Sequence, residues 1–174
     1  EALYDDEEHV VEGFEETEFI INGETFHIEG PSAVASGTDA GDYPVNVDGG
    51  IRVIDSQGND VTDQFEVDVP AAVLHISPRT VVLTSASDTK EYDGTPLRKE
   101  EIQVSGEGFV ENEGASYASF ATRTLSGTTE NYFSYTLNSD TIASNYEITT
   151  QFGTLEVTDR TNAYEIHLAG NVAE

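Results

Sequence analysis

The chain of 174 residues contains the stretch Phe65-Glu-Val-Asp-Val-Pro-Ala-Ala-Val-Leu74-His-Ile-Ser-Pro-Arg79, and a related stretch follows 81 residues later, Tyr146-Glu-Ile-Thr-Thr-Gln-Phe-Gly-Thr-Leu155-Glu-Val-Thr-Asp-Arg160. The two align without a gap, aromatic on aromatic and Leu on Leu. Apolar and polar residues alternate at the start of each, a pattern typical of half-buried antiparallel strands. A strand pattern that returns at a fixed interval predicts a repeat architecture.

A second pair of segments supports the repeat. Leu3-Tyr4-Asp5-Asp6-Glu7-Glu8 aligns with Glu91-Tyr92-Asp93-Gly94-Thr95-Pro96, at an interval of 88. We therefore expect two modules, residues 1–79 and 80–160, with Ser77-Pro78-Arg79 at the join. Proline has no N–H to donate to a sheet and favours an extended junction, so the modules are expected to be joined end to end. Residues 161–174 could be a final strand, the start of a third module or a tail.

The composition favours an all-β fold. Thr, Val, Ile, Tyr and Phe recur along the chain, and such side chains suit a half-buried pleated surface. Besides the aligned stretches and the apolar run Thr80–Thr84, strands are expected near residues 24–29, 43–47, 51–54, 101–105, 116–124 and 132–137. Two small folds remain open, an immunoglobulin-like sandwich and a β-grasp. The grasp needs a helix across its sheet, for which Thr95–Ile102 is the best candidate.

The charge balance limits the partners. The chain has 34 Asp and Glu against 7 Lys and Arg, a formal net charge of −27. Phosphate backbones and anionic lipid headgroups require basic surfaces, so we expect no nucleic acid partner and no direct membrane contact. Cations, basic proteins and neutral glycans remain as partners. Salt is expected to stabilise the compact state because it screens the self-repulsion.

Catalytic patterns are missing from the sequence. There is no cysteine, no Gly-x-Ser-x-Gly elbow and no paired histidine spacing of a metal site. We therefore expect a chain that is not an enzyme. Because no Met occurs anywhere, the chain is expected to be an internal piece of a longer protein.

The repeated motifs resemble a known class of module. Lys90-Glu-Tyr92-Asp93-Gly94-Thr95-Pro96-Leu97 and Asn145-Tyr146-Glu-Ile-Thr, followed by Gly153-Thr-Leu155-Glu-Val157-Thr158, are similar to MBG-type and bacterial immunoglobulin-like repeats of cell-surface proteins. Residues 1–160 are covered, although Asp6 stands where the family usually has Gly. The resemblance implies export, attachment to the bacterial cell wall, and arrays that hold a distal adhesive domain away from the cell. It brings no catalytic residues.

Two groups of side chains are candidate sites. Asp55, Asn59, Asp60 and Asp63 could supply hard oxygens to calcium, the one cofactor considered, although a turn with solvated acids explains them as well. Lys90 and Asn145 belong to the same module and could form the intramolecular Lys–Asn crosslink found in some surface modules. The ordinary alternative is a solvent-facing lysine.

Two functions follow from the sequence. The first is a non-catalytic stalk or spacer of an adhesin, contacting neighbouring repeats of the same chain on the extracellular face of the bacterium. The second is a module that binds host glycans such as mucins, or matrix proteins. Exposed aromatic rings would serve the second function, and the candidates are Tyr117, Tyr132, Phe133, Tyr135 and Tyr164.

Overall fold

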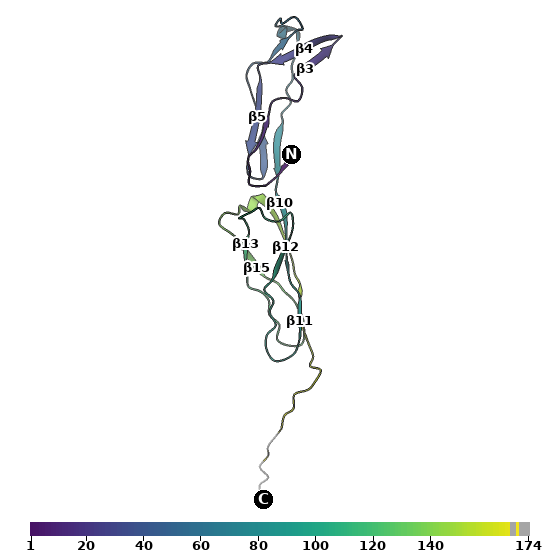
Figure 1. The fold of residues 1–174 in the computed structure, drawn as a ribbon, viewed down its shortest axis with the longest axis vertical. Coiled ribbons are helices and arrows are strands. Elements are labelled where there is room, and N and C mark those ends of the chain that lie inside the picture. The colour runs from purple at the N-terminus through teal and green to yellow at the C-terminus, as the bar shows by residue number, and fades with distance from the viewer. Residues whose placement is uncertain (168–169, 171–174) are drawn as a thin grey trace. The chain divides into compact units, whose positions relative to one another are not determined.

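The computed structural model describes residues 1–167 and Gly170, and it is built from strands (Figure 1). The described residues contain seventeen strands, two short 3-10 turns and no α-helix. The mostly-β fold expected from the composition is confirmed. The helix considered at Thr95–Ile102 is absent: this segment has no helical residue, and Leu97 forms a β-bridge with Arg123.

The chain divides into two compact units. Unit 1 comprises Glu1–Arg79 together with Ile142–Glu147, and unit 2 comprises Thr80–Thr141 with Ile148–Glu174. The short segment 142–147 therefore makes its contacts in unit 1, although the aligned stretches place it in the second repeat. It contributes the ring of Tyr146, whose edge packs against Tyr4 with centroids 5.7 Å apart.

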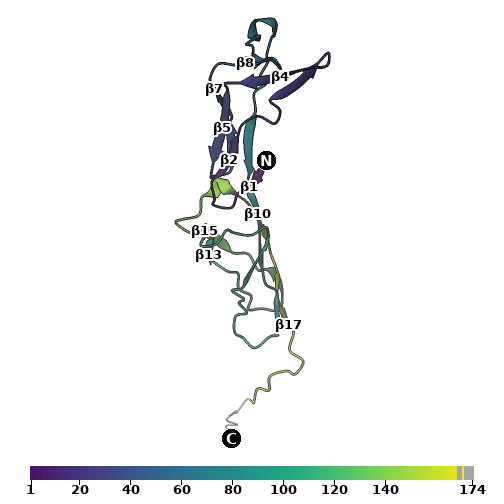
Figure 2. The same cartoon turned by 45° about the horizontal axis from the view of Figure 1, so that its top comes forward.

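Unit 1 contains three sheets of three strands. Its elements are β1 (Ala2–Leu3), β2 (His9–Glu12), β3 (Glu18–Ile21), β4 (Glu24–Glu29), β5 (Ser32–Gly37), β6 (Gly41–Pro44), β7 (Asn46–Asp48), β8 (Arg52–Ile54), the turn η1 (Thr62–Gln64) and β9 (Val73–Ser77). The sheets are ordered β1-β9-β6, β2-β5-β7 and β3-β4-β8. Figure 1 shows the antiparallel pair β3 and β4, and Figure 2 shows β2 beside β5.

The second repeat contains the remaining strands. These are β10 (Arg79–Ser85), β11 (Asp88–Glu91), β12 (Ile102–Gly106), β13 (Ala115–Ala118), β14 (Gly127–Glu130), β15 (Ser134–Leu137), the turn η2 (Ala143–Asn145), β16 (Tyr146–Gln151) and β17 (Thr154–Thr158). The sheets are ordered β12-β10-β16, β11-β17-β14 and β13-β15.

One sheet is built in the same way in both units. An early strand lies parallel to the last strand of each repeat, β1 to β9 and β11 to β17, and an antiparallel strand, β6 or β14, pairs with the other edge of the last strand. In the second repeat β10 precedes β11 and belongs to another sheet. The register agrees with the sequence alignment, because Ala2 pairs with Ile76 and Lys90 with Val157, at intervals of 88 and 81. We call β1–β9 and β11–β17 the terminal pairs.

The cores are small and lie beneath the terminal pairs. In unit 1 Tyr4, Leu74 and Ile76 are buried, and in unit 2 Leu155 and Val157 pack with Leu97 and Ala121. These side chains alternate with exposed ones along β9 and β17, as the period-two pattern predicts. The duplicated stretches therefore supply Leu74 and Ile76 to the core of unit 1 and Leu155 and Val157 to that of unit 2, whereas Leu97 and Ala121 come from outside them.

One predicted strand differs between the repeats. Tyr146–Gln151 forms β16, whereas the aligned residues 65–70 of unit 1 belong to no strand. The prediction of a paired strand at Phe65–Val69 was therefore wrong. The physical reason is that β16 pairs with β10, whereas no strand among the described residues pairs with residues 65–70.

Candidate functional site

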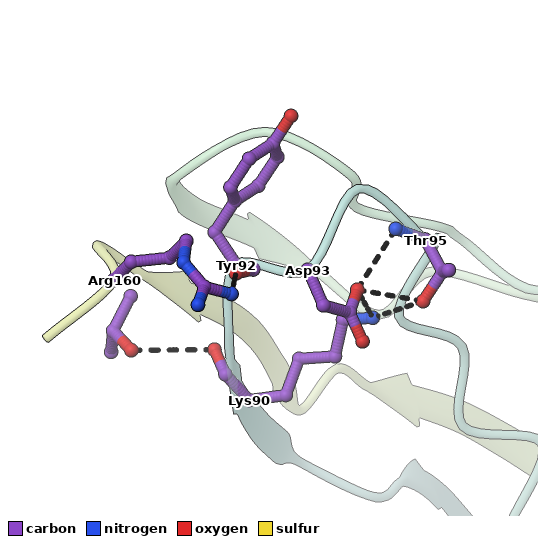
Figure 3. Close-up of polar contacts among 6 residues, drawn as sticks. Lys90, Tyr92, Asp93, Thr95 and Arg160 are labelled. Atoms are coloured by element: carbon purple, nitrogen blue, oxygen red, sulfur yellow. Dashed lines mark hydrogen bonds and ion pairs between the residues drawn. The ribbon is translucent and has the colours of Figure 1, made fainter. Parts of the chain in front are cut away.

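The turn after β11 contains a group of polar side chains that are bonded to one another (Figure 3). The Asp93 carboxylate accepts hydrogen bonds through Oδ1 from Lys90 Nζ at 2.7 Å, from Thr95 N at 2.8 Å and from Thr95 Oγ1 at 2.7 Å. Gly94 lies between them at φ 82°, a left-handed conformation that glycine adopts without strain. The motif Tyr-Asp-Gly-Thr therefore forms a closed turn.

The hydrogen bonds also fix the charge of Asp93. Lys90 and then Thr95 hold the pKa of the Asp93 carboxyl well below its usual range, because both stabilise the ionised form. This carboxylate already accepts three donors, so its role is to close the turn.

Arg160 joins the end of β17 to the same turn. Its Nη1 donates to the Tyr92 carbonyl oxygen at 3.3 Å and its Nε donates to the Asn162 carbonyl oxygen at 2.8 Å. The guanidinium carbon lies 3.8 Å from the centroid of the Tyr164 ring, a cation–π geometry. Figure 3 shows Arg160 beside Tyr92, on the opposite side of the turn from Thr95.

Unit 1 contains the same arrangement. Tyr4 N donates to the Ser77 carbonyl oxygen at 2.9 Å, as Tyr92 N donates to Thr158 at 2.9 Å. Arg79 Nη1 donates to the Tyr4 carbonyl oxygen at 3.2 Å, the counterpart of Arg160 on Tyr92. The role of neither arginine was predicted from the sequence, although each ends an aligned stretch, which is a detectable signal.

Two of the calcium candidates, Asp55 and Asp60, accept hydrogen bonds from other groups of the protein. Asp55 accepts hydrogen bonds from the Asn59 side chain and from the backbone N–H groups of Asn59 and Gln57, and these bonds lower its pKa. Asp60 accepts from Thr62 and from Arg52 Nε, which lower its pKa to about 2. Asp63 lies in η1. The described residues contain no group of three or more His, Cys, Asp or Glu side chains placed to hold a metal ion.

The crosslink candidates have separate partners. Lys90 Nζ is bonded to Asp93 and to Thr95 Oγ1. Asn145 is fully buried in unit 1, where its Nδ2 donates to Asp39 Oδ1 at 2.9 Å and its Oδ1 accepts from Ala40 N at 2.8 Å. The structure therefore does not bring the Lys90 amine and the Asn145 amide together.

The aromatic candidates divide into packed and exposed rings. Phe133 packs against Phe120, Phe152 and Tyr117 with centroids 5.7–6.0 Å apart, and burial raises the pKa of Tyr117. Tyr132 is 56% exposed and Tyr135 is 37% exposed, so their rings are accessible to a ligand. Tyr164 is also exposed, with one ring face over Arg160.

Comparison of the chain with protein-family models, with curated proteins and with solved structures finds no match. Across the part of the chain that the structure describes, no helix has the length and apolar character to cross a membrane.

Proposed function

We propose that this chain is a non-catalytic repeat segment of a bacterial cell-surface protein, exported and anchored through another part of the protein, where it acts as the stalk or spacer of an adhesin. The observation that carries the proposal is the terminal pair, built twice with the same register and the same arginine on the turn carbonyl. Modules of this kind transmit tension between their two ends.

The direction of the terminal strands suits this role. In a parallel pair, a pull on the start of one strand and on the end of the other acts along the strands. The hydrogen bonds lie across that direction, so they are loaded together and not one after another. In unit 2 four residue pairs, from Asp88–Leu155 to Glu91–Thr158, share the load.

The surface chemistry is consistent with a spacer. A net charge of −27 keeps chains apart in solution and disfavours contact with anionic lipid and nucleic acid. Three of the acids, Asp55, Asp60 and Asp93, close turns. Those contacts stabilise loops between strands.

A second function is favoured by the exposed rings of Tyr132 and Tyr135, which could pack against a sugar face or an apolar side chain. This function is the binding of host glycans, such as mucins, or of matrix proteins.

The two functions are separated by a binding experiment. The labelled chain is applied to immobilised mucins, a glycan panel and matrix proteins at physiological salt, with and without calcium. The spacer predicts no saturable binding that survives a few hundred millimolar salt. The binding module predicts saturable binding that is lost in Tyr132→Ala/Tyr135→Ala. The matched variant Leu125→Ala alters an exposed residue outside these rings and should keep that binding. This result would favour the binding function over the spacer function.

A further inference from the structure

The segment Ile142–Glu147 packs in unit 1, although the chain on both sides of it belongs to unit 2. It consists of the turn η2 and the start of β16. Asn145 is fully buried, and Tyr146 is 6% exposed with its ring edge against Tyr4. Two side chains of the second repeat therefore complete unit 1. We call this segment the strap.

Asn145 binds a loop of unit 1 with both ends of its amide group. Its Nδ2 donates to Asp39 Oδ1 at 2.9 Å, and its Oδ1 accepts from Ala40 N at 2.8 Å. A buried amide without such partners carries a desolvation penalty, and an asparagine offers the one donor and the one acceptor that this loop needs. The contact is therefore specific for the asparagine side chain.

The loop that receives Asn145 is held in place by unit 1 itself. It joins β5 to β6, and the Tyr43 hydroxyl donates to the Asp39 carbonyl oxygen at 2.9 Å. The Tyr43 ring lies against Gly37, where an added Cβ would be 2.3 Å from ring atoms. Contacts within residues 37–43 therefore position both partners of Asn145.

Unit 2 holds both ends of the strap. Before it, the buried Thr141 Oγ1 accepts from Gly114 N at 2.8 Å and donates to the Gly114 carbonyl oxygen at 3.1 Å. After it, β16 continues to Gln151 and pairs with β10. A segment that is fixed at both ends has little backbone freedom to lose, whereas a free segment must be ordered residue by residue. The fold of unit 2 therefore pre-organises the strap for unit 1.

We propose that the strap makes the stability of unit 1 depend on the fold of unit 2, in that direction only. When unit 2 unfolds, the strap loses both anchors, Asn145 and Tyr146 leave unit 1, and Tyr4 becomes exposed to water. The reverse does not hold, because unit 2 includes no residue before Thr80. The inference does not rest on the proposed function, since a spacer and a binding module would contain the same strap.

The dependence is tested by unfolding one unit at a time in the full chain. Leu155→Ser/Val157→Ser places two hydroxyl groups in the core of unit 2, and Leu74→Ser/Ile76→Ser alters the aligned positions of unit 1. Hydrogen exchange read by mass spectrometry reports unit 1 through β1, β6 and β9, and unit 2 through β11, β14 and β17. We expect the first variant to unfold unit 2 and also to speed exchange in unit 1 at least about tenfold. The second variant should leave exchange in unit 2 within about twofold of the natural chain.

Two results of this experiment overturn the proposal. One is unchanged protection of unit 1 in a chain whose unit 2 is unfolded. The other is loss of protection in unit 2 when unit 1 is unfolded, because the dependence would then run in both directions.

A second set of variants leaves both cores unchanged and tests Asn145 directly. Asn145→Asp removes the donor to Asp39 and brings two carboxylates together, so at neutral pH exchange in β1, β6 and β9 should rise about tenfold, with no change in β11 and β17. Adding Asp39→Asn returns the donor and the acceptor in exchanged places and should restore the natural rate. Gln64→Glu adds the same charge at the aligned, exposed position of η1 and should have no effect. An Asn145→Asp chain that exchanges like the natural one, or a double variant that does not recover, overturns the role of the strap.

Discussion

The guanidinium of Arg160 donates to the carbonyl oxygen of Tyr92 at 3.3 Å, although 68 residues separate the two along the chain. This bond fastens the end of β17 to the turn that follows β11, and therefore joins the two parallel strands of the terminal pair of unit 2 at one end. Arg79 and Tyr4 repeat the contact in unit 1. A bond that is conserved between two diverged repeats of one chain indicates a shared mechanical or folding requirement.

Replacing Arg160 by lysine should destabilise unit 2. Arg160 reaches two carbonyl oxygens through Nη1 and Nε, and a single ammonium cannot reproduce this planar geometry. We expect a loss of about 1 kcal/mol in the free energy of unfolding, measured by urea denaturation. Arg98→Lys is the matched control, since Arg98 pairs with the exposed Glu100. Equal losses in both variants would contradict the role given to Arg160.

Replacing Asp6 by glycine should stabilise unit 1. Asp6 has φ 67° and takes the position of Gly94, which has φ 82°. A left-handed backbone costs a residue with a Cβ more than it costs glycine, so we expect a gain of about 0.5–1 kcal/mol by thermal or urea unfolding. Glu8→Gly removes the same charge at a position without positive φ and should give no gain. Destabilisation by Asp6→Gly would show that the Asp6 side chain has a role of its own.

Acid should weaken unit 2 through Asp93. The pKa of Asp93 is lowered in the folded state, so the stability it contributes is complete above its unfolded pKa near 3.8 and is lost as the pH falls through the folded value. The difference in melting temperature between the natural chain and Asp93→Asn should therefore be largest at pH 5 and shrink below pH 3.8. Asp140→Asn, at an exposed position, should show no such convergence.

A methyl group at Gly153 should destabilise unit 2. Its Cβ would lie 2.5 Å from the Ser85 carbonyl oxygen and 2.6 Å from the Ala86 carbonyl carbon, both backbone atoms that cannot move independently. We expect Gly153→Ala to cost about 1–3 kcal/mol by urea denaturation. Gly50→Ala meets no atom within 4 Å and should be neutral. A neutral Gly153→Ala would mean that the end of β10 approaches Gly153 less closely than described.

The duplicated strands could be predicted from the sequence because their information is local. Leu74, Ile76, Leu155 and Val157 alternate with polar residues, and this alternation directs them into the core. The turn at Asp93-Gly94 could also be predicted, because its signal lies in two adjacent residues. The two repeats also align over these segments, which placed the terminal strands at the correct intervals.

The absence of a strand at residues 65–70 could not be predicted, because pairing depends on residues elsewhere in the chain. Phe65–Val69 has the alternation of a strand, but a strand also needs a partner, and β10 supplies one only to the second repeat. The calcium and crosslink candidates were predicted from residue type alone. In the structure Asp55 and Asp60 accept hydrogen bonds within turns, and Asn145 donates to Asp39. The spacing of these residues in the sequence does not predict such contacts.

The most direct test of the spacer is force spectroscopy of unit 2 in two pulling directions. The chain has no cysteine, so engineered pairs define the attachment points. Ser87→Cys with Asp159→Cys pulls along the parallel strands β11 and β17, whereas Leu125→Cys with Asp159→Cys opens the antiparallel pair β14 and β17 from its end. We expect a several-fold higher unfolding force for the first pair. Equal forces in the two directions would contradict a terminal pair built to carry tension.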